Sequence, residues 1–170
     1  VAALEASVAA LSGTKHAIGC ANGTDAILLA MRALDIGAGD EVVTSPFTFF
    51  ATAGTIHNVG AKPVFVDIDP ATYNIRPDLA HAAVTNRTKA VIPVDLFGQM
   101  APIEEIRRLL PSMPIIEDAA QSIGARRKID GTWRMAGEAA TIGTFSFFPS
   151  KNLGGYGDGG MIVTQDEAIA

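Results

Sequence analysis

Apolar residues follow two patterns that alternate along this chain. Residues 1–12 and 25–34 have the composition and spacing of helices, whereas residues 41–44 form a short apolar run of the kind found in buried strands. The same alternation predicts helices over residues 1–12, 25–34, 48–58, 77–84 and 102–110, and strands over residues 41–44, 63–66, 89–94, 114–117, 140–147 and 161–164.

Strands that are almost continuously apolar, placed between helices, indicate a largely parallel sheet that is covered on both faces. We therefore expect an α/β fold in three layers, with a mostly parallel sheet between two layers of helices. No repeat, linker or low-complexity segment marks an internal boundary. Residues 165–170 have the pattern of a helix start, so we expect residues 1–170 to be part of a larger domain.

Composition and charge exclude several classes of protein. The chain of 170 residues is 48% apolar and 18% charged, too hydrophobic for disorder, yet no stretch reaches the roughly 18 to 20 apolar residues that span a bilayer. Its 13 basic and 18 acidic residues give a net charge of −5, without the basic surface that nucleic acids require. Cys20 is the single cysteine and the first residues lack a secretion signal, so we expect a cytoplasmic protein without membrane or nucleic-acid partners.

Ligands of such sheets bind beyond the carboxyl ends of the strands, which directs attention to the loops there. The first such loop, residues 21–25, precedes a predicted helix and reads Ala-Asn-Gly-Thr-Asp. Backbone N–H groups at a helix N-terminus, with small residues and a hydroxyl, form an anion site. Taken alone, the segment is read more simply as an ordinary N-cap.

The second loop, residues 118–122, follows a buried strand and begins with an aspartate. Neighbouring strand side chains point to opposite faces, so Glu117 and Asp118 diverge and do not form an acid–base pair. Asp118, set among small alanines, is suited either to approach a cationic ligand or to cap a helix, and the residues leave both alternatives open.

The third loop lies within the aromatic and glycine-rich run 143–160, which contains one lysine, Lys151. A lysine desolvated in such surroundings has a lowered pKa and becomes an amine nucleophile, unlike a lysine on the surface. The loop therefore contains a candidate for covalent chemistry.

Other polar residues have structural explanations. His16 and Cys20 have the spacing of a metal pair on a helix, but they lead into a loop without further ligands, so we expect no metal site. His57 lies in a predicted helix with no nucleophile motif beside it, as does His81. The aspartates of the segment 67–69 follow a strand and are typical of turns.

Five ordered segments carry a resemblance to a known family. Together they resemble the DegT/DnrJ/EryC1/StrS family of sugar aminotransferases. The resemblance implies a pyridoxal-phosphate-dependent aminotransferase of fold type I that acts as a homodimer on a keto group of a nucleotide-linked sugar, with an amino acid such as glutamate as donor. Residues 1–170 would then be the incomplete large, cofactor-binding domain, without the C-terminal small domain. The segments are 22–25, 44–52, 63–69, 117–122 and 146–153, the last followed by Gly157-Asp-Gly-Gly160.

The resemblance also implies roles for single residues. Lys151 would hold the cofactor through its amine and then move a proton between the substrate carbon and the cofactor. Asp118 would pair with the pyridinium nitrogen and keep the ring protonated, and Gln121 would lie near the phenolic oxygen.

Four more residues would complete the cofactor site. By resemblance, Gly23 and Thr24 would offer the phosphate a helix N-terminus, and the Ser146 hydroxyl would add a further donor. Phe49 would stack on the cofactor ring, although a core position on the predicted helix 48–58 is an alternative for this aromatic residue.

Two competing functions are weighed against transamination. Sugar dehydratases that resemble this family have histidine in place of the lysine, so Lys151 favours transamination. A non-catalytic regulator of the same fold would be expected to lose Lys151 or Asp118, and this chain has both.

Overall fold

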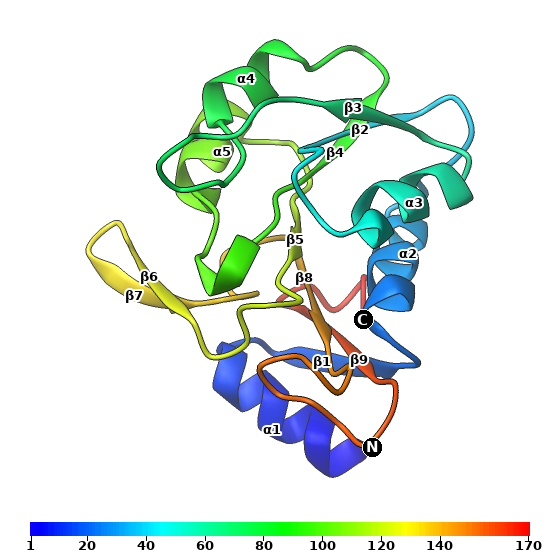
Figure 1. The fold of residues 1–170 in the computed structure, drawn as a ribbon, viewed down its shortest axis with the longest axis vertical. Helices are drawn as coiled ribbons and strands as arrows, with labels where there is room; N and C mark the ends of the chain where they lie inside the picture. The colour runs from blue at the N-terminus through cyan, green and yellow to red at the C-terminus, as the bar shows by residue number, and fades with distance from the viewer.

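The computed structural model describes residues 1–170, and Figure 1 shows its helices and strands. One short 3-10 helix, η1, spans Leu96–Gly98. The α-helices are α1 (Ala2–Ser12), α2 (Gly23–Ala33), α3 (Phe50–Asn58), α4 (Pro77–Ala82) and α5 (Ile103–Leu109). The strands are β1 (His16–Cys20), β2 (Glu41–Thr44), β3 (Lys62–Phe65), β4 (Thr88–Ile92), β5 (Ile116–Asp118), β6 (Arg126–Ile129), β7 (Thr132–Met135), β8 (Ile142–Ser146) and β9 (Gly160–Thr164).

The sheet is mostly parallel, as predicted, with one strand reversed. Strands β3, β2 and β4 pair in parallel, and β5 pairs in parallel with β8. Parallel bridges at Val91–Ile115 and Val94–Asp118 join β4 to β5. Strand β9 is antiparallel to both of its neighbours, β8 and β1. The spatial order is therefore β1-β9-β8-β5-β4-β2-β3, with only β9 running in the opposite direction.

Helices cover both faces of this sheet, which confirms the three-layer prediction. Neighbouring strand residues enter different cores because their side chains alternate: Val42 packs in a core with residues of α2 and α3, whereas Val43 packs with residues of α4 and α5. A third core joins Val8 of α1 to Phe145 of β8 and Val163 of β9. None of the helices combines the length and the hydrophobicity that a membrane span requires.

Three segments differ from the prediction. His16 and Cys20 lie on β1, an extended strand, so the helical metal spacing considered for them does not apply. Residues 126–135 form the β6–β7 hairpin, which projects from the body of the molecule (Figure 1) and was not predicted. Residues 165–170 form a turn rather than a helix, with the Asp166 carboxylate accepting from the Ala168 N–H at 2.8 Å.

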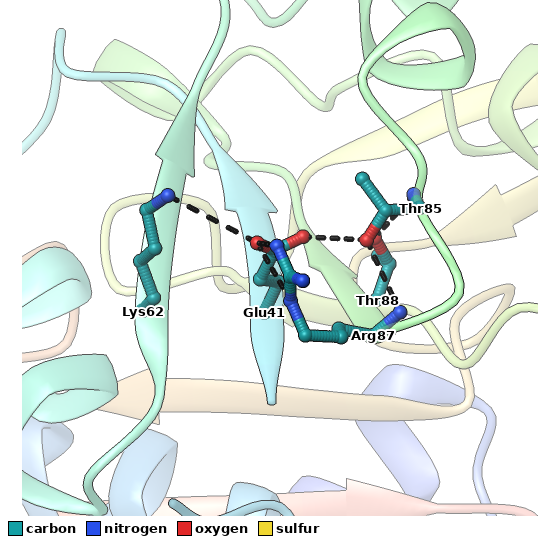
Figure 2. A network of polar contacts seen from close by, with 5 residues as sticks. All are labelled: Glu41, Lys62, Thr85, Arg87 and Thr88. Atoms are coloured by element: carbon teal, nitrogen blue, oxygen red, sulfur yellow. Dashed lines mark hydrogen bonds and ion pairs between the residues drawn. The ribbon is translucent and has the colours of Figure 1, made fainter. Parts of the chain in front are cut away.

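A polar network ties the strands together at the amino edge of the sheet (Figure 2). Glu41, the first residue of β2, is 3% exposed and accepts from the Thr85 hydroxyl and the Arg87 Nη2, both at 2.6 Å. Lys62 Nζ, at the start of β3, lies 3.9 Å from the same carboxylate. The Thr85 hydrogen bond and then the Arg87 guanidinium lower the pKa of Glu41. Its charge is thus balanced by donors of the chain itself.

Candidate active site

A cavity of about 640 Å³ opens at the carboxyl edge of the parallel strands, where ligands of such sheets are expected. The strand order brings the ends of β4, β5 and β8 together at this edge, beside the N-terminus of α2. Every site residue expected from the sequence lines it, although the residues come from distant segments. These residues are Gly23, Thr24, Phe49, Asp118, Gln121, Ser146 and Lys151.

The N-terminus of α2 presents donors to the cavity. The Asn22 side chain caps the helix by accepting from the Asp25 N–H at 2.8 Å, as in an ordinary N-cap. The N–H groups of Gly23 and Thr24 have no acceptor within the chain. A Cβ atom at Gly23 would lie 2.6 Å from the Ser146 Cβ, so glycine lets α2 approach β8 closely. The capping and anion-site readings are therefore compatible.

Asp118 ends β5, lines the cavity and is 5% exposed. Its carboxylate accepts from the Thr52 hydroxyl at 2.7 Å and the Ala120 N–H at 3.3 Å. Burial raises the pKa of Asp118, while these two hydrogen bonds and the charge of Lys151 oppose the rise. A turn follows rather than a helix, so the helix-cap alternative is wrong. The Glu117 carboxylate accepts from Gly137 instead, which confirms that the two acids diverge.

Lys151 lies in a tight loop directly after β8. Its own N–H donates to the Phe148 carbonyl at 2.8 Å, and the Gly155 N–H closes the loop on the Phe147 carbonyl at 2.8 Å. A side chain at Gly154 would collide with the Pro149 carbonyl, which explains a glycine here. The half-buried Lys151 Nζ makes no hydrogen bond or ion pair within the chain. The loop therefore holds a free amine at the cavity.

Phe49 and Gln121 line other parts of the cavity. Phe49 precedes α3 as its N-cap residue and is 73% exposed, so its alternative as a core aromatic is wrong. Gln121 Oε1 accepts from the Phe97 N–H at 2.8 Å, which leaves the Nε2 amino group without a partner in the chain. Phe97 has a φ of 56°, in the left-handed region that non-glycine residues rarely adopt.

Two acids near the cavity were not assigned a role from the sequence. Asp95 follows β4, lines the cavity and is completely buried, and Glu117 of β5 is equally buried behind it. A polar residue directly after the predicted strand 89–94 was a signal for Asp95, because Asp118 directly follows the predicted strand 114–117 in the same way. The contact between the two acids depends on the β4–β5 pairing, which no sequence pattern revealed.

Fold and cavity together define a class of protein. The unpaired N–H groups of α2, with the hydroxyls of Thr24 and Ser146, suit an anion such as a phosphate. The buried Asp118 carboxylate suits a cationic atom, and Lys151 offers a free amine on the same cavity. The chain is thus an α/β protein with a cavity whose lining suits an anionic ligand that also carries a cationic group, and a lysine lines the same cavity.

The chain belongs to the DegT/DnrJ/EryC1/StrS aminotransferase family, whose profile matches residues 1–170. It is 58% identical to the pleiotropic regulatory protein of Geobacillus stearothermophilus, over 98% of this chain and 44% of that protein. It is 51% identical to the UDP-2-acetamido-2-deoxy-3-oxo-D-glucuronate aminotransferase of Pseudomonas aeruginosa, over 100% of this chain and 47% of that enzyme. The chain thus spans a little under half the length of these relatives.

Solved structures have the same fold. The chain resembles DesV of S. venezuelae in complex with a ketimine intermediate, with a TM-score of 0.92 and 41% identity over 99% of this chain and 45% of that one. It also resembles NtdA of Bacillus subtilis with bound cofactor PMP, with a TM-score of 0.90 and 34% identity over 99% of this chain and 37% of that one. These similarities confirm the fold class and the family expected from the sequence.

Proposed function

We propose that the protein is a pyridoxal-phosphate-dependent aminotransferase that moves an amino group from an amino acid, such as glutamate, to a keto group of a nucleotide-linked sugar. The observation that carries the proposal is the meeting of Lys151, Asp118 and the α2 N-terminus on one cavity. A relative that is 51% identical is named for transamination of a UDP-linked oxo sugar, which supports this substrate class.

Pyridoxal phosphate fits the donors and acceptors of the cavity. Its phosphate matches the free N–H groups of Gly23 and Thr24 and the hydroxyl of Ser146. Its ring nitrogen, when protonated, matches the Asp118 carboxylate, which is buried without a bonded cation. The Gln121 amino group is a donor for the phenolic oxygen, and the exposed face of Phe49 is available for stacking on the ring.

The residues of the chain divide the proposed chemistry between them. When bound, pyridoxal phosphate supplies a carbonyl that condenses with amines and a ring that withdraws electrons from the reacting carbon. Lys151 would hold the cofactor through its amine, and when that amine is free it would move a proton at the substrate carbon. Asp118 would keep the ring nitrogen protonated, since a buried carboxylate stabilises a neighbouring cation.

The proposed assembly extends beyond this chain. We infer that residues 1–170 are part of the large domain, and that a C-terminal small domain completes the protein. Two exposed aromatic side chains line the cavity, with Phe49 73% and Phe148 51% exposed. Phe50 and Tyr156, close to them in the sequence, are exposed as well. Apolar surface of this kind favours burial in an interface, so we propose a homodimer whose partner covers this rim.

A regulatory role is the second candidate, because the 58% identical relative is named a pleiotropic regulatory protein. A regulator without catalysis would have no need of a free lysine and a buried carboxylate on one cavity, and both groups are present here. A dehydratase is disfavoured because residue 151 is lysine rather than histidine. The three functions differ in whether they require a covalent link at Lys151.

Borohydride reduction of the full-length protein tests the proposal. We expect a yellow protein whose cofactor becomes irreversibly attached on reduction, because an imine between an amine and the cofactor is reduced to a stable amine. Lys151→Ala should abolish the attachment, whereas Lys128→Ala, which removes an exposed lysine of the β6–β7 hairpin, should leave it unchanged. Attachment at wild-type stoichiometry in Lys151→Ala would assign the role to another lysine. Keto-sugar amination with glutamate then separates an aminotransferase from a regulator.

A further inference from the structure

Two carboxyl groups that the proposed chemistry does not use lie close together at the cavity, with Asp95 in its lining. Asp95 follows β4 and Glu117 lies on β5, and both are completely buried. Their carboxyl groups lie close enough for each to shift the pKa of the other. Neither forms an ion pair with a lysine, arginine or histidine. Two buried carboxylates in contact repel each other strongly, so the pair must hold a proton.

The hydrogen bonds around the pair show which acid carries that proton. Asp95 is supplied with donors: Oδ1 accepts from the Ala101 N–H at 2.8 Å and Oδ2 from the Ser122 hydroxyl at 2.7 Å. Glu117 has one donor, the Gly137 N–H, at 2.9 Å from Oε2. Its Oε1 atom is buried and accepts no hydrogen bond from any donor of the chain. A proton on Glu117 Oε1 gives this atom a bond to donate to Asp95, whose ionised form is already stabilised by two donors.

Ionisation of the pair agrees with this assignment. Burial, followed by the charge of Asp95, raises the pKa of Glu117 well above its usual value. Burial raises the pKa of Asp95 to about 6, although the hydrogen bonds from Glu117, Ala101 and Ser122 oppose the rise. Asp118 is the other charged group that acts on Asp95, and its negative charge also disfavours a second ionisation. At neutral pH one proton therefore remains on the pair.

Asp95 links the pair to two loops of the cavity. Its bond to Ala101 closes the loop after β4, which contains Phe97, and its bond to Ser122 closes the loop after β5, which contains Gln121. The two loops meet where the Phe97 N–H donates to Gln121 Oε1, and Phe97 adopts its left-handed backbone there. A conformation of this kind persists only where surrounding bonds hold it in place.

We propose that Glu117 is a positioning residue that stays protonated at neutral pH and, through its hydrogen bond to Asp95, fixes the loops carrying Phe97 and Gln121 at the cavity. The orientation of Gln121 toward a cofactor rests on the function proposed above. The shared proton does not, because both acids and their partners belong to the chain itself.

Infrared spectroscopy of the cofactor-free, full-length protein tests the protonation directly. A carboxylic acid has a carbonyl stretch distinct from that of a carboxylate, and we expect this band at neutral pH in the wild type. Glu117→Gln should remove the band, since glutamine keeps the shape and the donor but has no acid proton. Glu41→Gln is the matched control, because Glu41 is ionised among cations and its replacement should leave the band in place. A band that persists in Glu117→Gln overturns the assignment.

Cofactor affinity, measured by equilibrium titration, tests the positioning role. Glu117→Gln should bind pyridoxal phosphate within about threefold of the wild type, whereas Glu117→Ala, which deletes the donor to Asp95, should bind about tenfold more weakly, the loss of one hydrogen bond to a charged group. The wild type should also lose affinity relative to Glu117→Gln as the pH rises through the raised pKa of Glu117. Equal losses in both variants would show that the donated proton does not position the loops. Failure of every protein to bind would overturn the proposed function and leave the infrared result standing.

Discussion

At the amino edge of the sheet, Glu41 is buried between Arg87, Lys62 and the Thr85 hydroxyl, whereas at the carboxyl edge three acids are buried without a bonded cation. Those three are Asp95, Glu117 and Asp118. The chain satisfies the first charge itself, as expected of a group that only stabilises the fold. At the carboxyl edge the chain does not balance all of the buried negative charge, and a ligand or a retained proton must do so. Such an arrangement is typical of functional sites.

The pKa shifts at the two edges have opposite directions. The pKa of Glu41 is lowered, so its ionised form stabilises the folded state. The pKa values of the three acids at the carboxyl edge are raised, chiefly by burial, so ionisation there destabilises the folded protein until a cation arrives. Variants at the two edges should therefore separate effects on catalysis from effects on stability.

The largest effect is expected from Asp118→Asn. An amide cannot keep the cofactor ring nitrogen protonated, so transamination should slow by about 3 to 4 kcal/mol in activation free energy, on the order of 100- to 1,000-fold. Asparagine can still accept from Thr52, so the melting temperature should not fall. Steady-state kinetics and thermal unfolding check this, with Glu41→Gln as the control that keeps its turnover. Turnover of Asp118→Asn within about threefold of the wild type would remove Asp118 from the proposed site.

A smaller effect is expected from Gly23→Ala. The added Cβ meets the Ser146 Cβ at 2.6 Å, so the first turn of α2 must move and its N–H groups lose their alignment. Cofactor affinity, measured by titration, should fall about tenfold, equivalent to about 1.4 kcal/mol.

Gly37→Ala is the matched control for this glycine. Gly37 lies near the amino edge, and its φ is not positive. A Cβ added at Gly37 would lie 3.8 Å from the nearest atom, the Val59 carbonyl oxygen, which is an ordinary contact. Unchanged affinity is expected for this variant. A similar loss in both variants would mean that the close approach of α2 to β8 is not what shapes the anion site.

Stability should respond mainly at the amino edge. Glu41→Gln removes the charge that Arg87 and Lys62 share, and the melting temperature should fall by about 2 to 4 °C. Asp78→Asn removes one partner of an exposed ion pair with Arg76 and should change it by about 1 °C or less. Calorimetry measures both. A larger loss in Asp78→Asn than in Glu41→Gln would contradict the role given to burial.

The pH dependence of stability should distinguish the edges by sign. Because its pKa is lowered, ionised Glu41 stabilises the folded state at pH values above the usual pKa range of glutamate. This stabilisation is lost as the pH falls through the lowered pKa. Because the pKa of Asp95 is raised, protonated Asp95 stabilises the folded state below about pH 4, and this stabilisation is lost as the pH rises through about 6. The raised pKa of Asp118 acts in the same direction. The melting temperature of cofactor-free Asp118→Asn should therefore rise relative to the wild type by about 2 °C between pH 4 and 7. If the melting temperature of Asp118→Asn instead falls relative to the wild type over this pH range, the pKa of Asp118 is not raised.

Local patterns predicted much of the fold, and distant partners decided the rest. Strand β2 was predicted with its observed bounds because all four of its residues are buried, so a short apolar run is enough to identify it. Strand β1 was missed because it is half-buried throughout and pairs only with β9, from the other end of the chain. The β6–β7 hairpin had a local signal that was overlooked: Asp130 and Gly131 form its two-residue turn with φ values of 46° and 81°.

The cavity residues were found through motifs rather than through periodicity. A lysine in a glycine-rich run and an aspartate after a strand are visible in the sequence, and the structure brings both to one cavity. The roles given to them stay predictions. The approach of Asp95 to Glu117 requires β4 to lie beside β5 in the sheet. It could not be predicted because the order of the strands in the sequence does not fix their order in the sheet.

The reversed strand β9 also affects how the chain is assembled during translation. Strands β2, β3 and β4 find all their mutual partners within residues 41–92, so they can pair while the rest is still being synthesised. Strand β1 has β9 as its single neighbour and must wait until residues 160–164 leave the ribosome. Chains released before that point carry β1 as an open edge, and such edges recruit other strands, so truncated products should aggregate rather than accumulate as folded protein.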